Sequence, residues 1–386
     1  MSDFVLAKAS EKQVWDANFA REYIRDSSLL PYMGTGATSI FRVRNDLLNT
    51  AGAVVHFPLI ARTRGNGVTG TTALVGSEAD MPNYSCGVRV IYRRQAHRFH
   101  RGDTYRTEMD LMNAAKANLV DWSAGALRDR VLAQLASVVV KGADASDGTP
   151  GEDSTVAWGS ATEAQKDAYL DKNTDRILFG ALDSNLKQTA PAGGATNDMS
   201  KSLEEIDNTA DKLTAALILK AKRKAKTAGS ASGSMHIAPF KSDMTNGREY
   251  YVLFVDSNGF RDLGNDASII AANTNARARE GSGMDSNPLF QDGDLLYQGI
   301  IIRECPELAA VGAVGASAIQ VGNAFLCGQS AVAIAWGQKP KSVIDITDYQ
   351  ARQGVGVEEI SGEQKVSFNG VQYGVVTIFH ASVNDA

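Results

Sequence analysis

The stretch DTYRTEMDLMNAAKANLVDWSAGALRDRVLAQLASVVVKG, residues 103–142, decides the fold of this chain. It contains no proline, and Asp103 or Thr104 can cap the start of a helix that runs to about Lys141. At ~1.5 Å per residue this helix is about 55 Å long, more than twice the globular mean. Gly142 then ends it.

An apolar stripe follows one side of this predicted helix. It begins at Met112, continues through Leu119 and Trp122, and recurs every three to four residues as far as Val138. We therefore expect Met112, Leu119 and Trp122 to pack against the rest of the molecule, with Trp122 largely buried.

Two strand-like runs precede the helix. The first alternates with period two, with Val55, Phe57 and Leu59 on one side, and the second, GVRVIYRRQAHRF, spans residues 87–99. Between them lie glycines at 65, 67, 70 and 76. The pattern predicts an extended β-hairpin over 51–101. Its connecting stretch of about 25 residues is long for a hairpin loop, which indicates a function.

The segments on either side of these elements are less regular. Residues 1–50 show little periodicity, which indicates an arm that lies on something else. Residues 143–200 change in composition, and we interpret them as an insertion with flexible loops. Ser202 and Glu205 form an S-x-x-E capping box, which predicts a helix ending in the basic run at 220–226.

Two strands are predicted in the later part of the chain, YYVLFV (250–255) and YQGIIIRE (297–304). They are followed by FLCGQSAVAIAWG (325–337), another apolar run, and by a C-terminal series ending in QYGVVTIFHASV. One long helix, one long hairpin and scattered mixed elements indicate an α+β fold rather than alternating βαβ units.

The bulk composition is that of a globular protein. The chain has 386 residues, enough for two or more compact units, and a net charge of −5 that does not indicate nucleic-acid binding. No apolar run is long enough for a membrane span. An odd number of cysteines without C-x-x-C spacing indicates neither a disulfide scaffold nor a zinc cage, so we expect free thiols at Cys86, Cys305 and Cys327. The apolar context of Cys305 and Cys327 predicts that these two are packed.

Motifs for catalysis or cofactor binding are weak. Gly65, Gly67 and Gly70 formally match the dinucleotide fingerprint, but no helical period follows them and Pro82 comes early. They are better explained as turn glycines at the tip of the hairpin. The five histidines form no metal-binding motif, and no P-loop or nucleophile elbow is present. We therefore expect no catalytic residue, no cofactor and no metal.

A basic run ends the predicted hairpin. Five arginines occur in thirteen residues without an acid: Arg89, Arg93, Arg94, Arg98 and Arg101. A solvated strand face is the ordinary explanation, and nucleic acid or an acidic partner protein are the functional ones. The hairpin context favours the partner protein, because a two-stranded arm is marginally stable alone.

Five blocks of sequence, in order, are similar to a known family. They are AGAVVHFPLIARTRGNGVTGTTALVGSEADM (51–81), the long helix with Asp121 and Trp122, REYYVLFVDSNGFRDL (248–263), GDLLYQGIIIRECPEL (293–308), and the run from NAFLCGQSAVAIAWG to FNGVQYGVVTIFHA. This ordered set resembles the phage N4-type major capsid proteins, a branch of the HK97-like capsid lineage.

The resemblance implies an HK97-like α+β capsid fold with named parts. These are an N-terminal arm (1–50), an extended loop (51–101), a peripheral domain (102–202) with a spine helix (103–141) and the insertion (143–200), an axial domain (about 203–340), and C-terminal strands that return to the peripheral domain (341–386).

The resemblance also implies a function and partners. The protein would be the major capsid protein of a tailed phage, assembling with itself as pentamers and hexamers into an icosahedral shell in the host cytoplasm. It would contact packaged DNA only non-specifically, bind no membrane, and meet a portal. No charge-rich helical segment precedes the arm, so a separate scaffold or decoration protein is expected. The alternative is a soluble oligomeric enzyme that uses a β-arm for oligomerisation.

The residues expected at the assembly interface lie on the hairpin. They are Gly65, Gly67, Gly70, Glu78 and Asp80 at the tip, with Arg89, Arg93, Arg94, Arg98 and Arg101 along the return strand. Met112, Leu119 and Trp122 would pack the spine helix.

Overall fold

The computed structural model describes residues 29–48, 52–60, 67–70, 75, 78, 83–104, 111–144, 151–189, 191–229, 235–243, 248–272 and 294–385. These residues form two compact units, each built from segments that are distant in the sequence. The first unit takes its described residues from 1–55, 88–132 and 332–364, and the second from 56–87, 133–331 and 365–386. Helices and strands are mixed in the α+β manner predicted.

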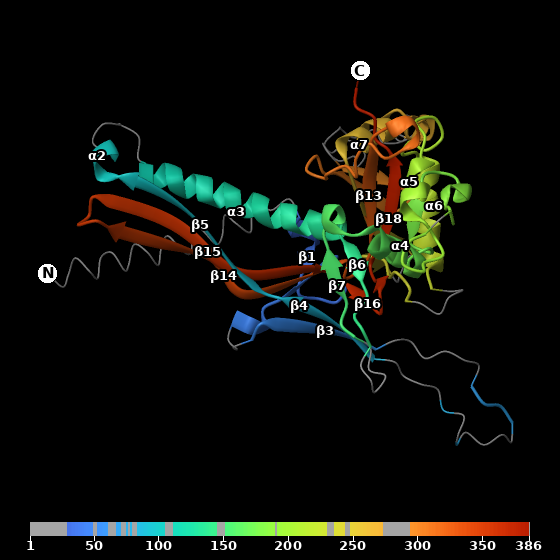
Figure 1. Ribbon diagram of the computed structural model, residues 1–386, viewed down its shortest axis with the longest axis horizontal. Helices are drawn as coiled ribbons and strands as arrows, with labels where there is room; N and C mark the ends of the chain where they lie inside the picture. The colour runs from blue at the N-terminus through green and yellow to red at the C-terminus, as the bar shows by residue number, and fades with distance from the viewer. Residues whose placement is uncertain are drawn as a thin grey trace. The chain divides into compact units, whose positions relative to one another are not determined.

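The first unit is a five-stranded sheet with one long helix. Its strand order is β1-β2-β14-β15-β5, with β2 parallel to β14 and β15 antiparallel to β5. The strands are β1 (Met33–Gly34), β2 (Phe41–Arg44), β5 (Ile91–His100), β14 (Val332–Thr347) and β15 (Arg352–Lys365). Helix α3 (Leu111–Leu135) runs along β5 and β15 (Figure 1), and the short α2 (Arg101–Thr104) follows β5.

Helix α3 covers only one face of this sheet. Leu119 and Val120 of the helix are buried against Val355 and Val357 of β15. Because side chains alternate along a strand, the residues between these valines face away from the helix. The first unit therefore has a packed face and an open face.

The second unit contains a seven-stranded sheet. Its order is β11-β12-β10-β13-β18-β8, and β9 pairs with β10 at one end of that strand. The strands are β8 (Ile177–Phe179), β9 (Lys241–Asp243), β10 (Arg248–Val255), β11 (Asp294–Tyr297), β12 (Ile300–Glu304), β13 (Val321–Cys327) and β18 (Val375–Ala381). Every residue of β13 and β18 is buried, the pattern of strands covered on both faces.

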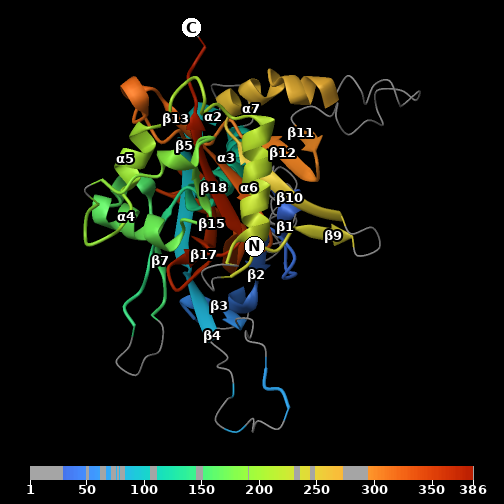
Figure 2. The ribbon, with the colours of Figure 1, turned by 90° about the vertical axis from the view of Figure 1, so that its right-hand side faces the viewer.

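Helices lie on both faces of this second sheet (Figure 2). On one face, Leu217 packs with Leu178 and Ile378. On the other, Leu203 packs with Ile177 and Phe379. The helices are α4 (Glu163–Lys172), α5 (Met199–Glu204), α6 (Ala215–Thr227) and α7 (Ser257–Gly264), of which α6 and α7 share the first face and α4 and α5 the second.

Three two-stranded sheets and several single 3-10 turns complete the described fold. The strand pairs are β3 (Val54–Ile60) with β4 (Asn83–Arg89), β6 (Val138–Val140) with β7 (Ser154–Val156), and β16 (Ser367–Phe368) with β17 (Val371–Gln372). The 3-10 turns are Leu30–Tyr32, Asp46–Leu48, Trp158–Ser160, Asp183–Asn185 and Ala316–Ala318.

The long helix is shorter than predicted. It ends at Leu135 rather than near Lys141, because the following valines form strand β6, which pairs with β7. Val138 and Val139 pack in the core of the second unit, and β-branched residues favour a strand there. Asp103 and Thr104 lie in α2 instead of capping α3.

The interpretation of residues 143–200 as an insertion with flexible loops is wrong for much of that stretch. It contains β7, α4, β8 and the start of α5, and β8 is a parallel partner of β18 in the large sheet. The predicted capping box is also wrong. Ser202 lies inside α5, and the helix with the basic end is α6, which is capped by the Thr214 hydroxyl accepting from the Leu217 amide.

The later apolar runs divide between the two units. The run 325–337 contains the end of β13 and the start of β14, which belong to different units. Strand β18 lies between β13 and β8 in the second sheet. Residues 29–48 of the predicted arm supply β1 and β2 to the first sheet.

Candidate assembly surfaces

The predicted hairpin exists as the pair β3–β4. Val55 and Phe57 of β3 are buried, whereas Ile60, at the end nearest the tip, is 61% exposed. The strand therefore leaves the packed part of the chain toward its tip, as expected of an arm.

The tip glycines have the geometry of turns. Gly67 and Gly70 have φ angles of 69° and 71°, and a Cβ at either position would meet nothing within 4 Å. The prediction that they supply left-handed turns is confirmed. Glu78 is exposed, and Gly65 and Asp80 lie outside the described residues.

The five predicted arginines do not share one strand. Arg89 ends β4, three others lie on β5, and Arg101 begins α2. Val90 separates β4 from β5, and its amide donates to the carbonyl of Ala53. Beyond that point β15 offers ten consecutive partners to β5. The prediction of one return strand over 87–99 is therefore wrong.

Arg93 has acidic partners in its own chain. Its guanidinium donates to the carbonyl and hydroxyl oxygens of Ser361, at 2.6 and 2.8 Å, and to Glu363 Oε2 at 3.1 Å. Arg130 of α3 donates to Glu359 Oε1 at 2.6 Å and to Glu363 Oε1 at 3.2 Å. The arginines are thus not all uncompensated, and this network fastens α3 and β5 to β15.

The carboxylates of this network are buried, so they depend on the paired arginines for their charged state. The Glu359 and Glu363 side chains are each 2% exposed. Burial raises the pKa of Glu359, and the positive charges of Arg130 and Arg93 oppose that rise. Sequence reasoning missed both glutamates, because they follow Arg93 by more than 260 positions. The only local signal was the acidic run in VEEISGE.

Two other predicted arginines lie on the open face of the first sheet. Arg94 stacks over the Tyr92 ring, 5.8 Å from its centroid, and Arg98 donates to Thr347 Oγ1. Both side chains are exposed. Arg89 and Arg101 are exposed as well, and the Arg101 amide donates to the carbonyl of Ala351. The structure thus brings Arg94 and Arg98 together and separates them from Arg93.

The predicted stripe on the long helix lies on its packed face. Leu119 is buried, and Met112 and Trp122 pack against the same cluster. Trp122 is less buried than Leu119. The contact is narrow, because two valines of β15 form the sheet side of this cluster.

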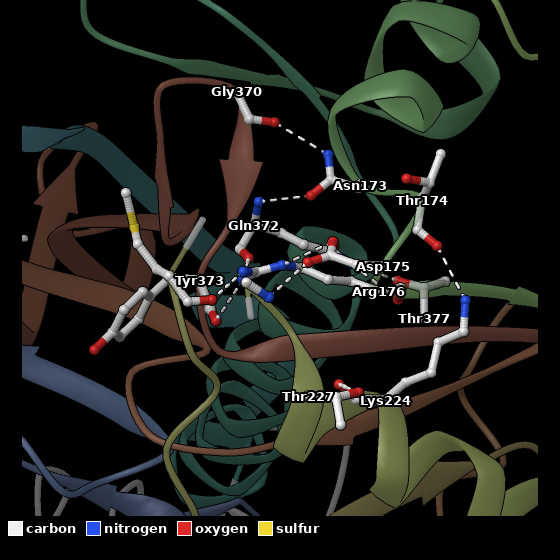
Figure 3. Close-up of polar contacts among 12 residues, drawn as sticks. Asn173, Thr174, Asp175, Arg176, Lys224, Thr227, Gly370, Gln372, Tyr373 and Thr377 are labelled. Carbon is white, nitrogen blue, oxygen red and sulfur yellow. Dashed lines mark hydrogen bonds and ion pairs between the residues drawn. The ribbon is translucent and has the colours of Figure 1, made fainter. Parts of the chain in front are cut away.

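The second unit contains a buried arginine that no motif indicated (Figure 3). Arg176 is fully buried, and its guanidinium donates to the main-chain carbonyls of Gln372, Tyr373 and Met235. Its Nε lies 3.3 Å from Asp175 Oδ1. Burial lowers the pKa of Arg176, and the Asp175 carboxylate opposes that change.

A buried lysine lies in the same unit. Lys365 Nζ donates to the Ser137 carbonyl at 2.7 Å and lies 3.4 Å from the Tyr169 hydroxyl. The Tyr169 hydroxyl in turn donates to Gln372 Oε1 at 2.6 Å. Burial lowers the pKa of Lys365 to about 7. These hydrogen bonds hold the start of the C-terminal segment in place. The Lys365 amine is buried and is therefore not exposed to a reactant.

His380, for which no motif indicated a role, is also structural. It is fully buried, with Nε2 at 3.1 Å from Asp256 Oδ1. Burial opposes ionisation of Asp256, but the interactions with His380, Ser382 and the Gly259 amide hold its pKa below the ordinary value. Asp256 caps α7, so this cluster anchors a helix.

The three cysteines are buried in the structure. Cys86, Cys305 and Cys327 are free thiols, as predicted, and burial raises the pKa of Cys86 to about 11. Within the described part of the chain, no three His, Cys, Asp or Glu side chains gather as metal ligands do. No helix among the described residues is long and apolar enough to span a membrane.

Comparison with known proteins agrees with this architecture. Residues 6–384 match the family of phage capsid proteins. A chain of the cyanophage Pam1 capsid asymmetric unit is similar over 94% of both chains, with 37% identity and a TM-score of 0.81. A search of curated protein sequences found no match.

Two more distant structures share the fold. The capsid of Ralstonia phage GP4 aligns with 92% of this chain and 90% of its own, at 19% identity and a TM-score of 0.66. The capsid of Helicobacter pylori bacteriophage KHP30 aligns with 92% of each chain, at 15% identity and a TM-score of 0.61. These findings do not favour the alternative of an oligomeric enzyme. The chain belongs to the phage capsid protein family and is a major capsid protein, a structural subunit that associates with its own copies to form the shell.

Proposed function

We propose that this capsid protein follows the HK97-like plan in its N4-type branch. In this assignment the first unit, with α3 as spine helix, is the peripheral domain, and the sheet of β10, β13 and β18 is the core of the axial domain. The order of the sequence blocks and the length of α3 along its sheet support the assignment.

The β3–β4 hairpin would be the arm by which one subunit holds its neighbour. One observation carries this role: at Gly67 and Gly70 an added Cβ would meet nothing within 4 Å. The tip therefore leaves open space around these two glycines. An arm of this kind lies over a second copy, and the glycine turns let its tip follow that surface.

Assembly proceeds by repetition of such contacts. Pentamers and hexamers place the same surfaces against each other in a ring, and closure of the shell multiplies contacts that are weak one at a time. In the host cytoplasm the subunit would further meet a portal and a separate scaffold or decoration protein. It would meet the packaged DNA without base contacts, in keeping with its net charge of −5.

Replacing residues 65–80 by a short Asn-Gly turn tests the arm. We expect a folded, soluble subunit that no longer closes shells, because a small loss recurs at every lattice position. Circular dichroism would check the fold, and sedimentation would count closed particles beside the wild type. Normal particles from the shortened chain would contradict the role of the arm. If the shortened subunit did not fold, residues 65–80 would be needed for the fold of the subunit itself instead of for assembly.

A further inference from the structure

The base of the β3–β4 hairpin is held on two faces. On the first, Phe57 of β3 and Cys86 of β4 are buried. Because side chains alternate along a strand, His56 and Ser85 lie on the second face. There the carboxylate of Glu152, from the segment before β7, lies with Oε1 2.7 Å from His56 Nδ1. The Ser85 hydroxyl donates to the same oxygen at 3.1 Å. One carboxylate therefore contacts both strands of the hairpin.

Gly87 leaves the space that this carboxylate fills. It lies inside β4, and its φ is outside the left-handed region, so its backbone does not require glycine. The three atoms nearest to an added Cβ all belong to Glu152, with Oε2 at 2.7 Å and Oε1 at 3.2 Å. Glycine weakens the interior of a strand, and there it often marks a close approach. We call the group of His56, Ser85, Gly87 and Glu152 the hairpin seat.

The main chain at Glu152 is fixed by the core of its own unit. Asp153, the next residue, is buried and accepts from the Gly370 amide at 2.8 Å. Strand β7 follows at once and pairs with β6. A Cβ at Gly142 would collide with the Glu152 carbonyl oxygen, so the two backbones are in close contact. Glu152 thus connects this core to the base of the hairpin.

The hairpin seat suits the control of direction better than the supply of stability. The side chains of His56 and Glu152 are 56% and 45% exposed, and exposed pairs of this kind contribute little to the free energy of unfolding. A tip residue such as Gly67 can lie as far as about 36 Å from His56 in an extended chain, so a rotation of about 10° at the base would move the tip by about 6 Å.

We propose that Glu152 is a positioning residue for assembly: its carboxylate, held on β3 and β4 beside Gly87, fixes the direction in which the arm leaves the subunit. An arm that already has its direction loses less conformational freedom when a neighbour binds it. This inference rests on the proposed function of the hairpin as an arm, and it adds the residue that orients the arm. No motif indicated Glu152, because it follows Ser85 by 67 positions.

Removal of the carboxylate tests this role. Glu152→Ala should leave the unfolding midpoint of the free subunit unchanged in chemical denaturation. In the same subunit the amides of β3 and β4 should exchange about fivefold faster. Sedimentation should find about tenfold fewer closed particles, because the loss recurs at every lattice position.

Two further variants control for shape and for charge. Glu152→Gln keeps an oxygen that can accept from Ser85, so it should retain at least half of the wild-type yield of particles. Glu204→Ala is the matched control, because Glu204 is an exposed glutamate of the same unit that pairs with Lys201 of its own helix. This control should assemble like the wild type.

Filling the space at Gly87 tests the hairpin seat from the other side. Gly87→Ala places a methyl group where the carboxylate lies, so the yield of closed particles should fall as far as in Glu152→Ala. The chain with both substitutions should be no worse than either single variant, because both remove the same interaction. Additive losses would show that the two residues act separately, and the inference would be wrong.

The outcomes separate this inference from the proposed function. If shortening 65–80 blocks assembly but Glu152→Ala forms shells at the wild-type yield, the arm is needed and its seat is not, so this inference is wrong. A lower unfolding midpoint of the whole subunit in Glu152→Ala would give Glu152 an ordinary structural role and would also overturn it. If the shortened chain forms normal shells, both are wrong. Equal, non-additive defects in Glu152→Ala and Gly87→Ala, with Glu152→Gln and the control assembling, support the positioning role.

Discussion

The two large sheets of this protein differ in how many of their faces are covered by helices of the same chain. The sheet containing β13 and β18 is covered on both faces by helices of its own chain, and every residue of these two strands is buried. The sheet containing β5 and β15 is covered on one face by α3, while its other face carries exposed arginines and the glycines Gly354 and Gly356. The first arrangement makes a core closed on both sides. In the second, the described residues cover only one side.

Their buried charges differ in the same way. In the second unit Arg176 is satisfied by main-chain carbonyls, which fixes chain segments against each other. In the first unit Arg93 and Arg130 meet the side chains of Glu359 and Glu363, so helix and strands are joined by ion pairs. Removing the bonds of Arg176 should therefore destabilise the second unit, and removing the ion pairs of Arg93 and Arg130 should destabilise the first.

The largest effect is expected at Arg176. Arg176→Met would leave three carbonyls, one of them in a fully buried bond, without this donor and should lower the free energy of unfolding by about 3–5 kcal/mol. Chemical denaturation of the free subunit measures the loss. Lys224→Met is a control, because Lys224 donates to a single carbonyl, that of Thr174. Equal, small losses in both variants would contradict the role of Arg176 as a structural centre.

On the long helix, Leu119→Ala should cost more than Trp122→Ala. Leu119 is 1% exposed, so its truncation leaves a cavity and should cost about 2–4 kcal/mol. Trp122 is only partly buried, and its truncation should cost about half as much. Thermal unfolding of the two variants side by side decides the order. A larger loss for Trp122→Ala would mean that the covered face of α3 is misassigned.

Arg93→Glu and Arg94→Glu should separate stability from assembly. The first puts a third carboxylate beside Glu359 and Glu363 and should destabilise the free subunit by about 1–3 kcal/mol. The second lies on the open face, so it should leave unfolding unchanged and reduce the yield of shells. Denaturation and sedimentation measured on both variants give the comparison. If the two variants showed the same stability and the same yield of shells, the two faces of β5 would not have the separate roles described.

A pH-dependent effect is expected at Lys365. Its pKa is about 7 in the folded chain and near 10.4 when unfolded, so the unfolded state binds more protons between these values. Stability from this group is therefore lost as pH falls from about 10.4 toward about 7, by at most about 1.4 kcal/mol per pH unit, and it changes no further below about 7. Tyr169 and Cys327 also face the amine, and burial raises the pKa of both. Lys365→Met should remove this slope, and an unchanged slope would contradict the assignment.

Periodic local patterns predicted the elements that depend on local contacts. The apolar stripe located Leu119 on the covered face of the helix, and glycine spacing located the turns at Gly67 and Gly70. The same reasoning missed the end of the helix. Three valines after Ser137 can continue a helical stripe or form a strand, and pairing with β7 decides between the two.

Contacts that join distant segments could not be predicted. The acids that meet Arg93 lie on β15, and the carbonyls that meet Arg176 lie near residues 235 and 372. Strand β8 has only three residues, too few for a recognisable alternation, yet it completes the large sheet. The capping box at Ser202 failed because such a box is a short pattern, and Asp198 instead caps the helix at that point.

Hydrogen exchange in free subunits and in assembled shells tests the central claim most directly. We predict that amides of β10, β13 and β18 are equally protected in both states, because their own chain buries them. Amides of residues 65–80, and those of 91–98 and 354–358 in the first sheet, should gain protection on assembly. Unchanged exchange in these three segments, with gains confined to the second unit, would contradict the account.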